Sequence, residues 1–232
     1  MSRRVEVVRK PSERRGYIKV GFLKTKAKSR FSHSARRAVF GVDLVQKIRR
    51  GGVGVIPTDT LYGIVGSAFS QKAVARIYRL RKRNLKKPMI VLIGDMRRAT
   101  WDKFGIHLDR RTLNLLKTLW PGKVSIILPI RNARFLKRLA YLHRGTKSIA
   151  FRMPKHIALR RFLVKTGPLV APSANIEGQP PACTIRDAQK YFGGPASGRI
   201  DFYVDSGRRD SLPSTLIAIR GKKVVVLRKG AH

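Results

Sequence analysis

The sequence predicts an α/β fold with a mixed sheet whose last two strands pair antiparallel. Short apolar runs alternate with amphipathic segments from residue 42 onward, and two β-rich segments joined at Gly221 and Lys222 close the chain. This alternation is typical of helices that cover a sheet. A chain of 232 residues is also long enough to bury the core of one domain.

Six elements are predicted before residue 131, and local signals mark their ends. Two glycines end the first helix, and Ser70 caps the second, whose inner face carries Val74, Ile77 and Tyr78. A Pro-Gly pair at 121–122 separates the third helix from an isoleucine-rich strand. In order, the elements are helix 43–52, strand 53–57, helix 71–83, strand 88–93, helix 108–120 and strand 123–130.

The second half of the domain continues the alternation and ends in a hairpin. Gly167 ends one helix, and Thr184 with Asp187 three residues later resembles a capping box for the next. Gly221 and Lys222 suit the turn between the closing strands. The elements are strand 147–153, helix 155–167, strand 168–175, helix 185–192, and strands 214–220 and 223–229.

Residues 1–40 differ from the domain that we expect over residues 41–232. They are rich in lysine and arginine and show weak apolar periodicity, apart from a short strand expected at 17–20. A flexible basic arm is the simplest interpretation. The Arg- and Ser-rich segment is also typical of organelle presequences, although Glu6 and Glu13 argue against a presequence.

The extreme positive charge restricts the partners. Fifty-two Lys and Arg residues face twelve Asp and Glu residues, a net charge of +40. Such a surface attracts polyanions, and we expect tRNA or another RNA to bind it. Solubility and docking on anionic lipid are the alternatives, but we find no amphipathic helix suited to insertion and expect no membrane association. The single cysteine, Cys183, excludes an intramolecular disulfide and favours a cytoplasmic setting.

Four polar clusters follow predicted strands or helices, where loops commonly carry function. Hydroxyls and backbone N–H groups after a strand suit a small carboxylate or phosphate, and a row of cations after a helix suits a polyphosphate. Taken alone, the first cluster is equally typical of a turn or cap, a lone row of cations is typical of a solvated face, and Ser and Asn in the third cluster are ordinary turn residues. The clusters are Thr58-Asp59-Thr60, Arg81-Lys82-Arg83 with Lys86-Lys87, Pro172-Ser173-Ala174-Asn175, and Pro213-Ser214-Thr215.

Several kinds of site have no signal in the sequence. Neither a Walker-type phosphate loop nor a dinucleotide-binding glycine pattern is present. No histidine accompanies a nucleophile elbow, and paired-carboxylate hydrolysis is disfavoured because acids are few. Catalysis would therefore depend on positioning and positive charge, as in nucleotidyl transfer.

Taken in order, these segments resemble the YrdC/TsaC family of threonylcarbamoyl-AMP synthases in its short, single-domain form. IPTDTLYGIVG resembles the family pattern P-T-[DE]-[TA]-[VL]-[YF]-G-[LV], and IYRLRKRNLKKPMIVLI resembles I-[FY]-x-x-K-x-R-x-x-x-[NK]-P-L. APSANIEGQPP resembles [ST]-x-S-A-N-x-S-G, and WPGKVSIILP, IAFRMP, SGRRDSLPSTLIAI and VVVLRKGAH match further family segments. The resemblance covers about residues 42–230.

The resemblance implies a fold and a reaction. We expect a YrdC-like mixed, twisted sheet with flanking helices around an open, positively charged cavity. The implied enzyme condenses L-threonine, bicarbonate and ATP, with Mg²⁺, to threonylcarbamoyl-AMP and pyrophosphate. A downstream transferase would then modify tRNA to N6-threonylcarbamoyladenosine.

The resemblance also assigns roles to residues. The catalytic set is expected at Arg81, Arg83, Ser173 and Asn175. Threonine and carbamate would lie against Thr58 and Ser125, with Asp59 a weaker candidate. The nucleotide and its phosphates would contact Lys87, Arg152, Ser214 and Arg228, and no protein ligand to a metal is expected.

Two departures from the family pattern bear on these roles. Arg81 stands where the family has lysine, which Lys82 could replace by a shift in register, and Ser125 replaces a threonine. An RNA- or ribosome-binding protein on the same fold, without synthase activity, is the alternative, and a YciO-like paralogue is a third. Intact Ser173, Asn175 and Arg83 favour the synthase.

Overall fold

The computed structural model describes residues 6–7, 40–194, 200–221 and 223–231. The predicted basic arm, residues 1–40, therefore lies outside the described residues except for Glu6–Val7 and Phe40, and so does the strand expected at 17–20. Within the described residues, the predicted mixed α/β fold is confirmed.

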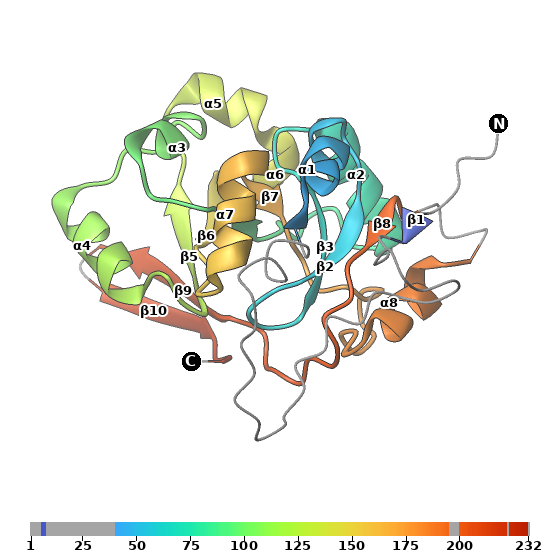
Figure 1. Ribbon diagram of the computed structural model, residues 1–232. Helices are drawn as coiled ribbons and strands as arrows, with labels where there is room; N and C mark the ends of the chain where they lie inside the picture. The colour runs from blue at the N-terminus through green and yellow to red at the C-terminus, as the bar shows by residue number, and fades with distance from the viewer. Residues whose placement is uncertain (1–5, 8–39, 195–199, 222, 232) are drawn as a thin grey trace.

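The sheet is long and mixed. Its strands are β1 Glu6–Val7, β2 Gly54–Pro57, β3 Tyr62–Ser67, β4 Val91–Leu92, β5 Val124–Pro129, β6 Ser148–Arg152, β7 Leu169–Val170, β8 Phe202–Tyr203, β9 Thr215–Arg220 and β10 Lys223–Arg228. Among the described residues these ten form one sheet in the order β1-β8-β2-β3-β7-β4-β6-β5-β9-β10 (Figure 1). The antiparallel β9–β10 pair confirms the predicted closing hairpin.

The helices begin and end at residues that the sequence marks. They are α1 Val42–Arg49, α2 Gln71–Leu80, α3 Arg98–Asp102, α4 Arg110–Leu119, α5 Ala133–Arg138, α6 Ala140–His143, α7 Ile157–Thr166 and α8 Ile185–Phe192. The Ser70 hydroxyl accepts the Ala73 N–H at 3.2 Å, as expected for a cap. The predicted capping box between Thr184 and Asp187 is present. Both signals therefore placed their helix starts correctly.

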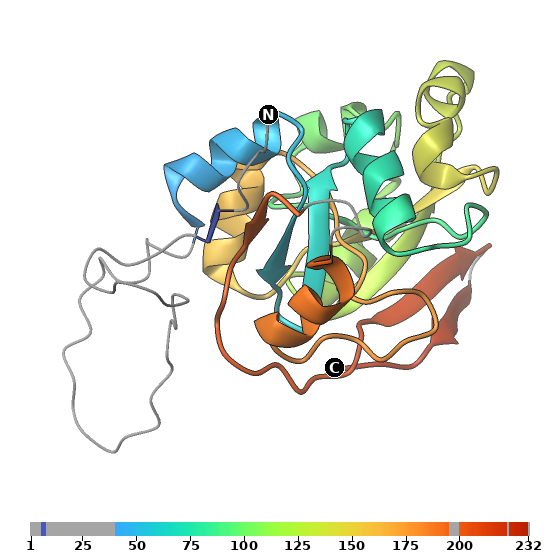
Figure 2. The same cartoon turned by 90° about the vertical axis from the view of Figure 1, so that its right-hand side faces the viewer.

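Helices cover both faces of the sheet (Figures 1 and 2). Along β2 and β3, Ile56 and Val65 join the apolar cluster that contains the inner residues of α1 and α7. Their neighbours Val55 and Ile64 join the larger cluster with α2, α4, α6 and α8. Because successive strand residues point to opposite faces, the two clusters lie on opposite sides of the sheet.

Several elements are not apparent from the sequence pattern. Strand β8 and helices α3, α5 and α6 are short, and β3 contains two glycines, which weaken a strand pattern. Helix α2 ends at Leu80, earlier than the predicted residue 83, because Lys82 adopts a left-handed backbone with φ of 48°. This early end turns Arg81 and Arg83 into loop residues.

Two buried tyrosines differ in how their hydroxyls are satisfied. The Tyr62 hydroxyl donates to the Gly207 carbonyl oxygen at 2.7 Å and accepts the Ser206 N–H at 2.9 Å. The Tyr203 hydroxyl is buried without a hydrogen-bonding partner among the described residues. Burial raises the pKa of Tyr203 to about 12. The Tyr203 hydroxyl is thus a cost to stability, whereas the Tyr62 hydroxyl ties down a loop.

The variant Tyr203→Phe is expected to raise the free energy of unfolding by about 1 kcal/mol, because it removes a buried unsatisfied hydroxyl. Tyr62→Phe is the matched control and is expected to lower it by about 1–2 kcal/mol. Urea denaturation measures both changes. Destabilisation of the Tyr203 variant to the same extent as the Tyr62 variant would contradict this interpretation.

Candidate active site

A cavity of about 320 Å³ lies against the sheet at β5, β6 and β9. Its apolar wall includes Ile127, Ala150 and Leu216, one residue from each strand. Their neighbours Phe151 and Ile217 point to the other face and belong to the large core cluster. The core on one side of the sheet therefore fixes the wall of the cavity on the other side.

The four polar clusters predicted from the sequence meet at this cavity. They come from the turn after β2, the loop after α2, the loop after β7 and the segment before β9. No two of these segments are adjacent in the chain, so the order of the strands brings them together. The cluster residues that line the cavity are Thr58, Thr60, Arg81, Arg83, Pro172, Ser173, Pro213 and Ser214.

The charge of the cavity is entirely positive. Among the described residues, those that line it include four arginines (Arg81, Arg83, Arg152 and Arg228) and no aspartate or glutamate. Burial, with a smaller contribution from Arg83, lowers the pKa of Arg81 to about 10, so this guanidinium is still charged at neutral pH. The expected positively charged cavity is present.

Arg81 is bonded directly to the loop after β7. Its Nε donates to the Asn175 carbonyl oxygen at 3.0 Å and its Nη2 to Asn175 Oδ1 at 2.9 Å. Nη2 also lies 3.4 Å from Ser173 Oγ, which itself donates to Asn175 Oδ1 at 2.7 Å. Nη1 is buried without a hydrogen-bonding partner among the described residues. Lys82, in contrast, is exposed and does not line the cavity, so of these two residues only Arg81 does.

Arg83 braces the loop that carries it. Its Nε donates to the Lys87 carbonyl oxygen at 3.1 Å and its Nη2 to the Pro88 carbonyl oxygen at 3.0 Å. Its Nη1 lies 3.7 Å from Glu177 Oε1. Lys87 does not line the cavity, and its ammonium lies 3.0 Å from the same Glu177 oxygen. The structure therefore separates Lys87 from the cavity-lining arginines with which the sequence groups it.

Arg152 forms a buried ion pair behind the first polar turn. Its Nη1 lies 2.9 Å from Asp59 Oδ1, and the exposed fractions of the two side chains are only 5% and 7%. The same nitrogen donates to Thr60 Oγ1 at 3.2 Å, and Thr60 Oγ1 lies 3.1 Å from Thr58 Oγ1. Asp59 Oδ2 accepts the Lys155 N–H. Asp59 thus supports the site from behind and does not line the cavity itself.

Arg228 holds the segment before β9 at the cavity. Its Nε and Nη2 donate to the Ser214 carbonyl oxygen at 3.2 and 2.8 Å. Ser214 Oγ lines the cavity and lies 2.9 Å from Ser125 Oγ. Ser125 is fully buried beneath Ser214 and does not line the cavity. A role for Ser125 in direct contact with a ligand would require Ser214 to move.

Four residues at the site were not singled out as site residues from the sequence. Thr60, Thr146 and Ser148 line the cavity with hydroxyls, and Glu177 lies at its rim beside Arg83. Thr60 belongs to the polar cluster Thr58-Asp59-Thr60, so the sequence did indicate it as a possible site residue. Thr146 and Ser148 give none, because isolated hydroxyl residues around a strand start are common.

The part of the chain that the structure describes contains neither a metal-binding cluster nor a membrane-spanning helix. There, no group of three or more His, Cys, Asp or Glu side chains could hold a metal ion. No described helix is both long and apolar enough to cross a membrane.

Fold and cavity together define an α/β protein with a ligand-sized, arginine-lined pocket. The chain belongs to the Sua5/YciO/YrdC family, whose model, described as "Telomere recombination", matches residues 46–230. The resemblance noted in the sequence is thereby confirmed at the level of the family.

Relatives and a solved structure support this placement. The threonylcarbamoyl-AMP synthase of Pyrococcus abyssi is 31% identical over 186 residues, which cover 79% of this chain and 52% of the relative. The synthase of Bacillus subtilis is 30% identical over 185 residues, covering 79% and 51%. The structure of P. abyssi Sua5 in complex with L-threonine superposes with a TM-score of 0.68 at 27% identity, covering 83% and 54%. The chain thus spans about half the length of these relatives.

The variant Asp59→Ala is expected to lower the free energy of unfolding by about 3 kcal/mol, because it leaves the buried Arg152 guanidinium without its carboxylate. The double variant Asp59→Ala/Arg152→Met should recover much of this loss, since no unpaired charge then stays buried. Urea denaturation measures both. Asp210→Ala is the control, because Asp210 pairs with Arg208 on the surface. The pair is not structural if Asp59→Ala and Asp210→Ala have equal effects.

Proposed function

We propose that the protein is a threonylcarbamoyl-AMP synthase, a nucleotidyltransferase that condenses L-threonine, bicarbonate and ATP to threonylcarbamoyl-AMP and pyrophosphate. The observation that carries the proposal is the cavity: four arginines and several hydroxyls line it, and they come from the segments that resemble the family motifs. Relatives at about 30% identity bear the name of this enzyme, which supports the same assignment.

The chemistry of the cavity suits this reaction. Threonine and bicarbonate lose water to give an N-carboxylate, and one of its oxygens attacks the α-phosphorus of ATP. The bond from that phosphorus to the bridging oxygen breaks, and pyrophosphate leaves. Negative charge spreads over the phosphoryl oxygens in the transition state, so guanidinium groups fixed in place would stabilise it. We propose this role for Arg83, Arg152 and Arg228, which line the cavity together with Arg81.

The neutral polar residues are proposed to orient the two smaller substrates. Thr58 and Ser173 present hydroxyls to the cavity and suit the threonine and its carbamate. Asn175 fixes Arg81 and Ser173, while Ser125 acts through Ser214. Lys87 would reach a phosphate only after leaving Glu177. Sua5 of P. abyssi binds L-threonine in its solved complex, which supports a threonine site on this fold.

Magnesium is proposed to enter with ATP. The cavity offers hydroxyls but no lining carboxylate among the described residues, which fits a cation held mainly by phosphate oxygens and water. The ion would supply neutralisation of phosphate charge. Arg83 and Arg152 would bind the phosphate oxygens that the ion leaves free.

The chemistry of the product implies that a second enzyme consumes it, and its substrates suggest the cell compartment. A mixed anhydride of a carbamate and AMP is an activated acyl donor, so a downstream tRNA threonylcarbamoyl transferase is proposed to consume it. We propose a cytoplasmic location for both enzymes, where ATP, threonine and tRNA are present.

Incubation of the pure protein with ATP, L-threonine and bicarbonate should yield threonylcarbamoyl-AMP, detected by its mass, and pyrophosphate. The variant Arg83→Ala should lose at least about a hundredfold of this activity, because phosphate positioning and charge stabilisation are lost together. Lys86→Ala is the matched control, since Lys86 is exposed on the same loop and does not line the cavity. Full activity in the folded Arg83 variant would reject this site.

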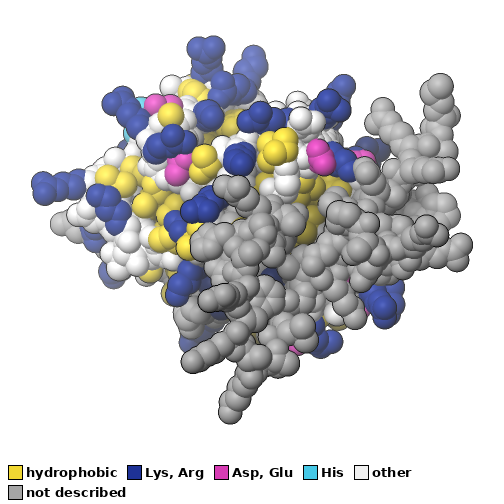
Figure 3. All heavy atoms as spheres, in the orientation of Figure 1, with side chains coloured by type: hydrophobic (Ala, Val, Ile, Leu, Met, Phe, Trp, Pro, Cys, Tyr) yellow, Lys and Arg dark blue, Asp and Glu magenta, His cyan; other side chains and the backbone are white. Residues whose placement is uncertain are grey.

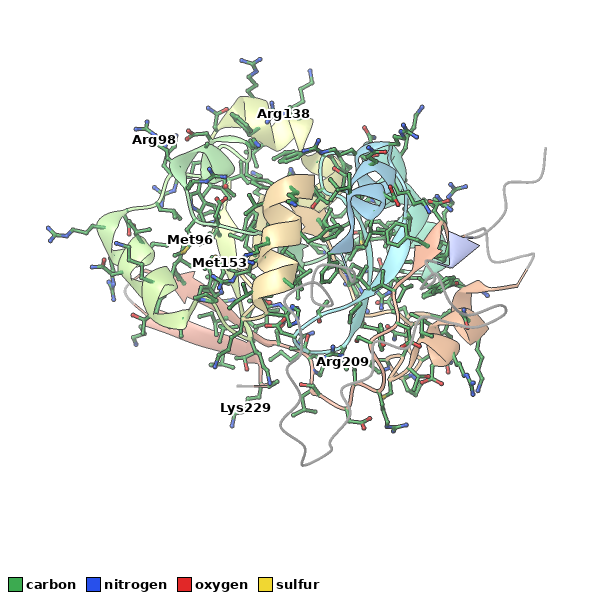
Figure 4. All side chains as sticks on the ribbon, in the orientation of Figure 1. Met96, Arg98, Arg138, Met153, Arg209 and Lys229 are labelled. Atoms are coloured by element: carbon green, nitrogen blue, oxygen red, sulfur yellow. The ribbon has the colours of Figure 1, made fainter. Side chains whose placement is uncertain are left out.

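A second function, RNA binding, is favoured by one observation. Residues 97–138, which include α3, α4 and α5, contain eleven lysines and arginines but only Asp102 and Asp109 as acids. Asp109 Oδ1 accepts the Thr112 N–H as the cap of α4, and Asp102 lies 3.9 Å from Arg98, so both acids have partners within the segment and cations still greatly outnumber them. Cationic side chains project from these helices, with Arg98 on α3 and Arg138 on α5 labelled in Figure 4, and Figure 3 shows many Lys and Arg side chains that protrude from this part of the surface. We propose that this α3–α5 face binds RNA phosphates.

Binding of tRNA should weaken steeply as salt rises, because each phosphate contact releases a counterion. The variant Arg134→Glu/Lys137→Glu on α5 should weaken binding and reduce the salt slope by about two. Arg161→Glu/Lys165→Glu on α7 is the charge-matched control, on the opposite side of the sheet. Filter binding or fluorescence anisotropy measures both. A salt-independent affinity would leave no role for the charge in RNA binding.

A further inference from the structure

Glu177 lies at a junction between two loops of the site. It follows Asn175 in the loop after β7, at a position where the family pattern has serine. Its Oε2 accepts the Asn84 N–H at 2.6 Å, and its own N–H donates to the Arg81 carbonyl oxygen at 2.8 Å. Both the side chain and the backbone of Glu177 therefore join its loop to residues 81–88, the loop after α2.

The same carboxylate holds two cations. Oε1 lies 3.0 Å from Lys87 Nζ and 3.7 Å from Arg83 Nη1. The other two nitrogens of the Arg83 guanidinium donate to carbonyl oxygens within the 81–88 loop. Among the described residues, Glu177 is thus the acid that lies at ion-pair distance from Arg83, and it faces the third nitrogen of that guanidinium from the opposite loop.

The position of Glu177 relative to the cavity limits what it does there. It does not line the cavity, while Arg83 does. Its carboxylate faces Arg83, Lys87 and the Asn84 N–H and is 23% exposed, so it lies behind the cation and at the rim. A carboxylate in this place is able to orient Arg83 without contacting a ligand in the cavity itself.

We propose that Glu177 is a positioning residue that fixes Arg83 and the 81–88 loop at the rim of the cavity, so that the cavity binds the phosphates of ATP more tightly. The ligand class rests on the proposed function, whereas the junction between the loops does not. Without Glu177, the loop loses an anchor on its backbone at Asn84 and on two side chains. Arg83 then has to be ordered when ATP binds, which weakens binding.

The negative charge of Glu177 acts on ATP binding in the opposite direction to positioning. The two effects can be measured separately. A carboxylate near the rim also opposes the approach of a polyanion and competes with it for Lys87. Glu177→Gln keeps an oxygen that accepts the Asn84 N–H but removes the negative charge, while Glu177→Ala removes both. If positioning dominates, Glu177→Gln should recover most of the affinity for ATP that Glu177→Ala loses. If charge competition dominates, both variants should bind ATP more tightly than the wild type.

The first experiment measures amide hydrogen exchange of residues 82–88 in the protein without ligand. Glu177→Ala should raise exchange in this segment, and Glu177→Gln should leave it closer to that of the wild type. Asp102→Ala is the control, since Asp102 is an exposed acid beside Arg98 on α3. Unchanged exchange in Glu177→Ala would overturn the junction, whatever the protein catalyses.

The second experiment measures ATP binding by calorimetry and the KM for ATP in synthesis of threonylcarbamoyl-AMP. Glu177→Ala should raise both the Kd and the KM about tenfold with a smaller change in kcat, and Glu177→Gln should recover most of the loss. Tighter binding by both variants, or equal binding by all three proteins, would overturn the positioning role. Absence of ATP binding by the wild type would instead reject the proposed function. The hydrogen-exchange experiment would still show whether Glu177 joins its loop to residues 82–88.

Discussion

The site depends on holding four guanidinium groups of like charge around one small cavity. Among the described residues no acid lines that cavity, so the arginines are not neutralised from within. Three are fixed from behind by neutral oxygens: Arg81 by those of Asn175, Arg83 by two loop carbonyls, and Arg228 by the Ser214 carbonyl. Arg152 differs, because it pairs with the buried Asp59 carboxylate. Hydrogen bonds to neutral oxygens orient a guanidinium without cancelling its charge. The positive field therefore stays available to an anion.

The fold supplies these oxygens because chain segments end at the cavity. The loop after α2, the loop after β7 and the segment before β9 supply the carbonyl oxygens that accept the arginine donors. Buried backbone groups require partners, and arginine donors provide several of them. The same contacts thus hold separate loops together and orient the cations, which links stability of the loops to the electrostatics of the site.

Much of this arrangement follows from the sequence, and the remainder does not for physical reasons. Periodicity and capping residues predicted most elements, and ordered motifs predicted that Thr58, Arg81 and Ser173 share a site. Motifs do not determine which side of a loop a long side chain takes, so the pairing of Lys87 with Glu177 was not foreseen. The burial of Ser125 beneath Ser214 depends on the parallel register of β5 and β9, which no local pattern encodes.

The two acids behind the arginines differ in how firmly they hold them. Asp59 and Arg152 are both almost fully buried, so separating them would leave a charge without water or partner. Glu177 is partly exposed and Lys87 is 60% exposed, so water can replace the contact between them at a small cost in free energy. One wall of the cavity is consequently fixed by a buried pair, while the rim around Arg83 is held by a junction that solvent reaches. If the cavity adjusts its shape when a polyanion enters, the adjustment is cheapest at the 81–88 loop, where Lys87 can exchange a carboxylate for a phosphate.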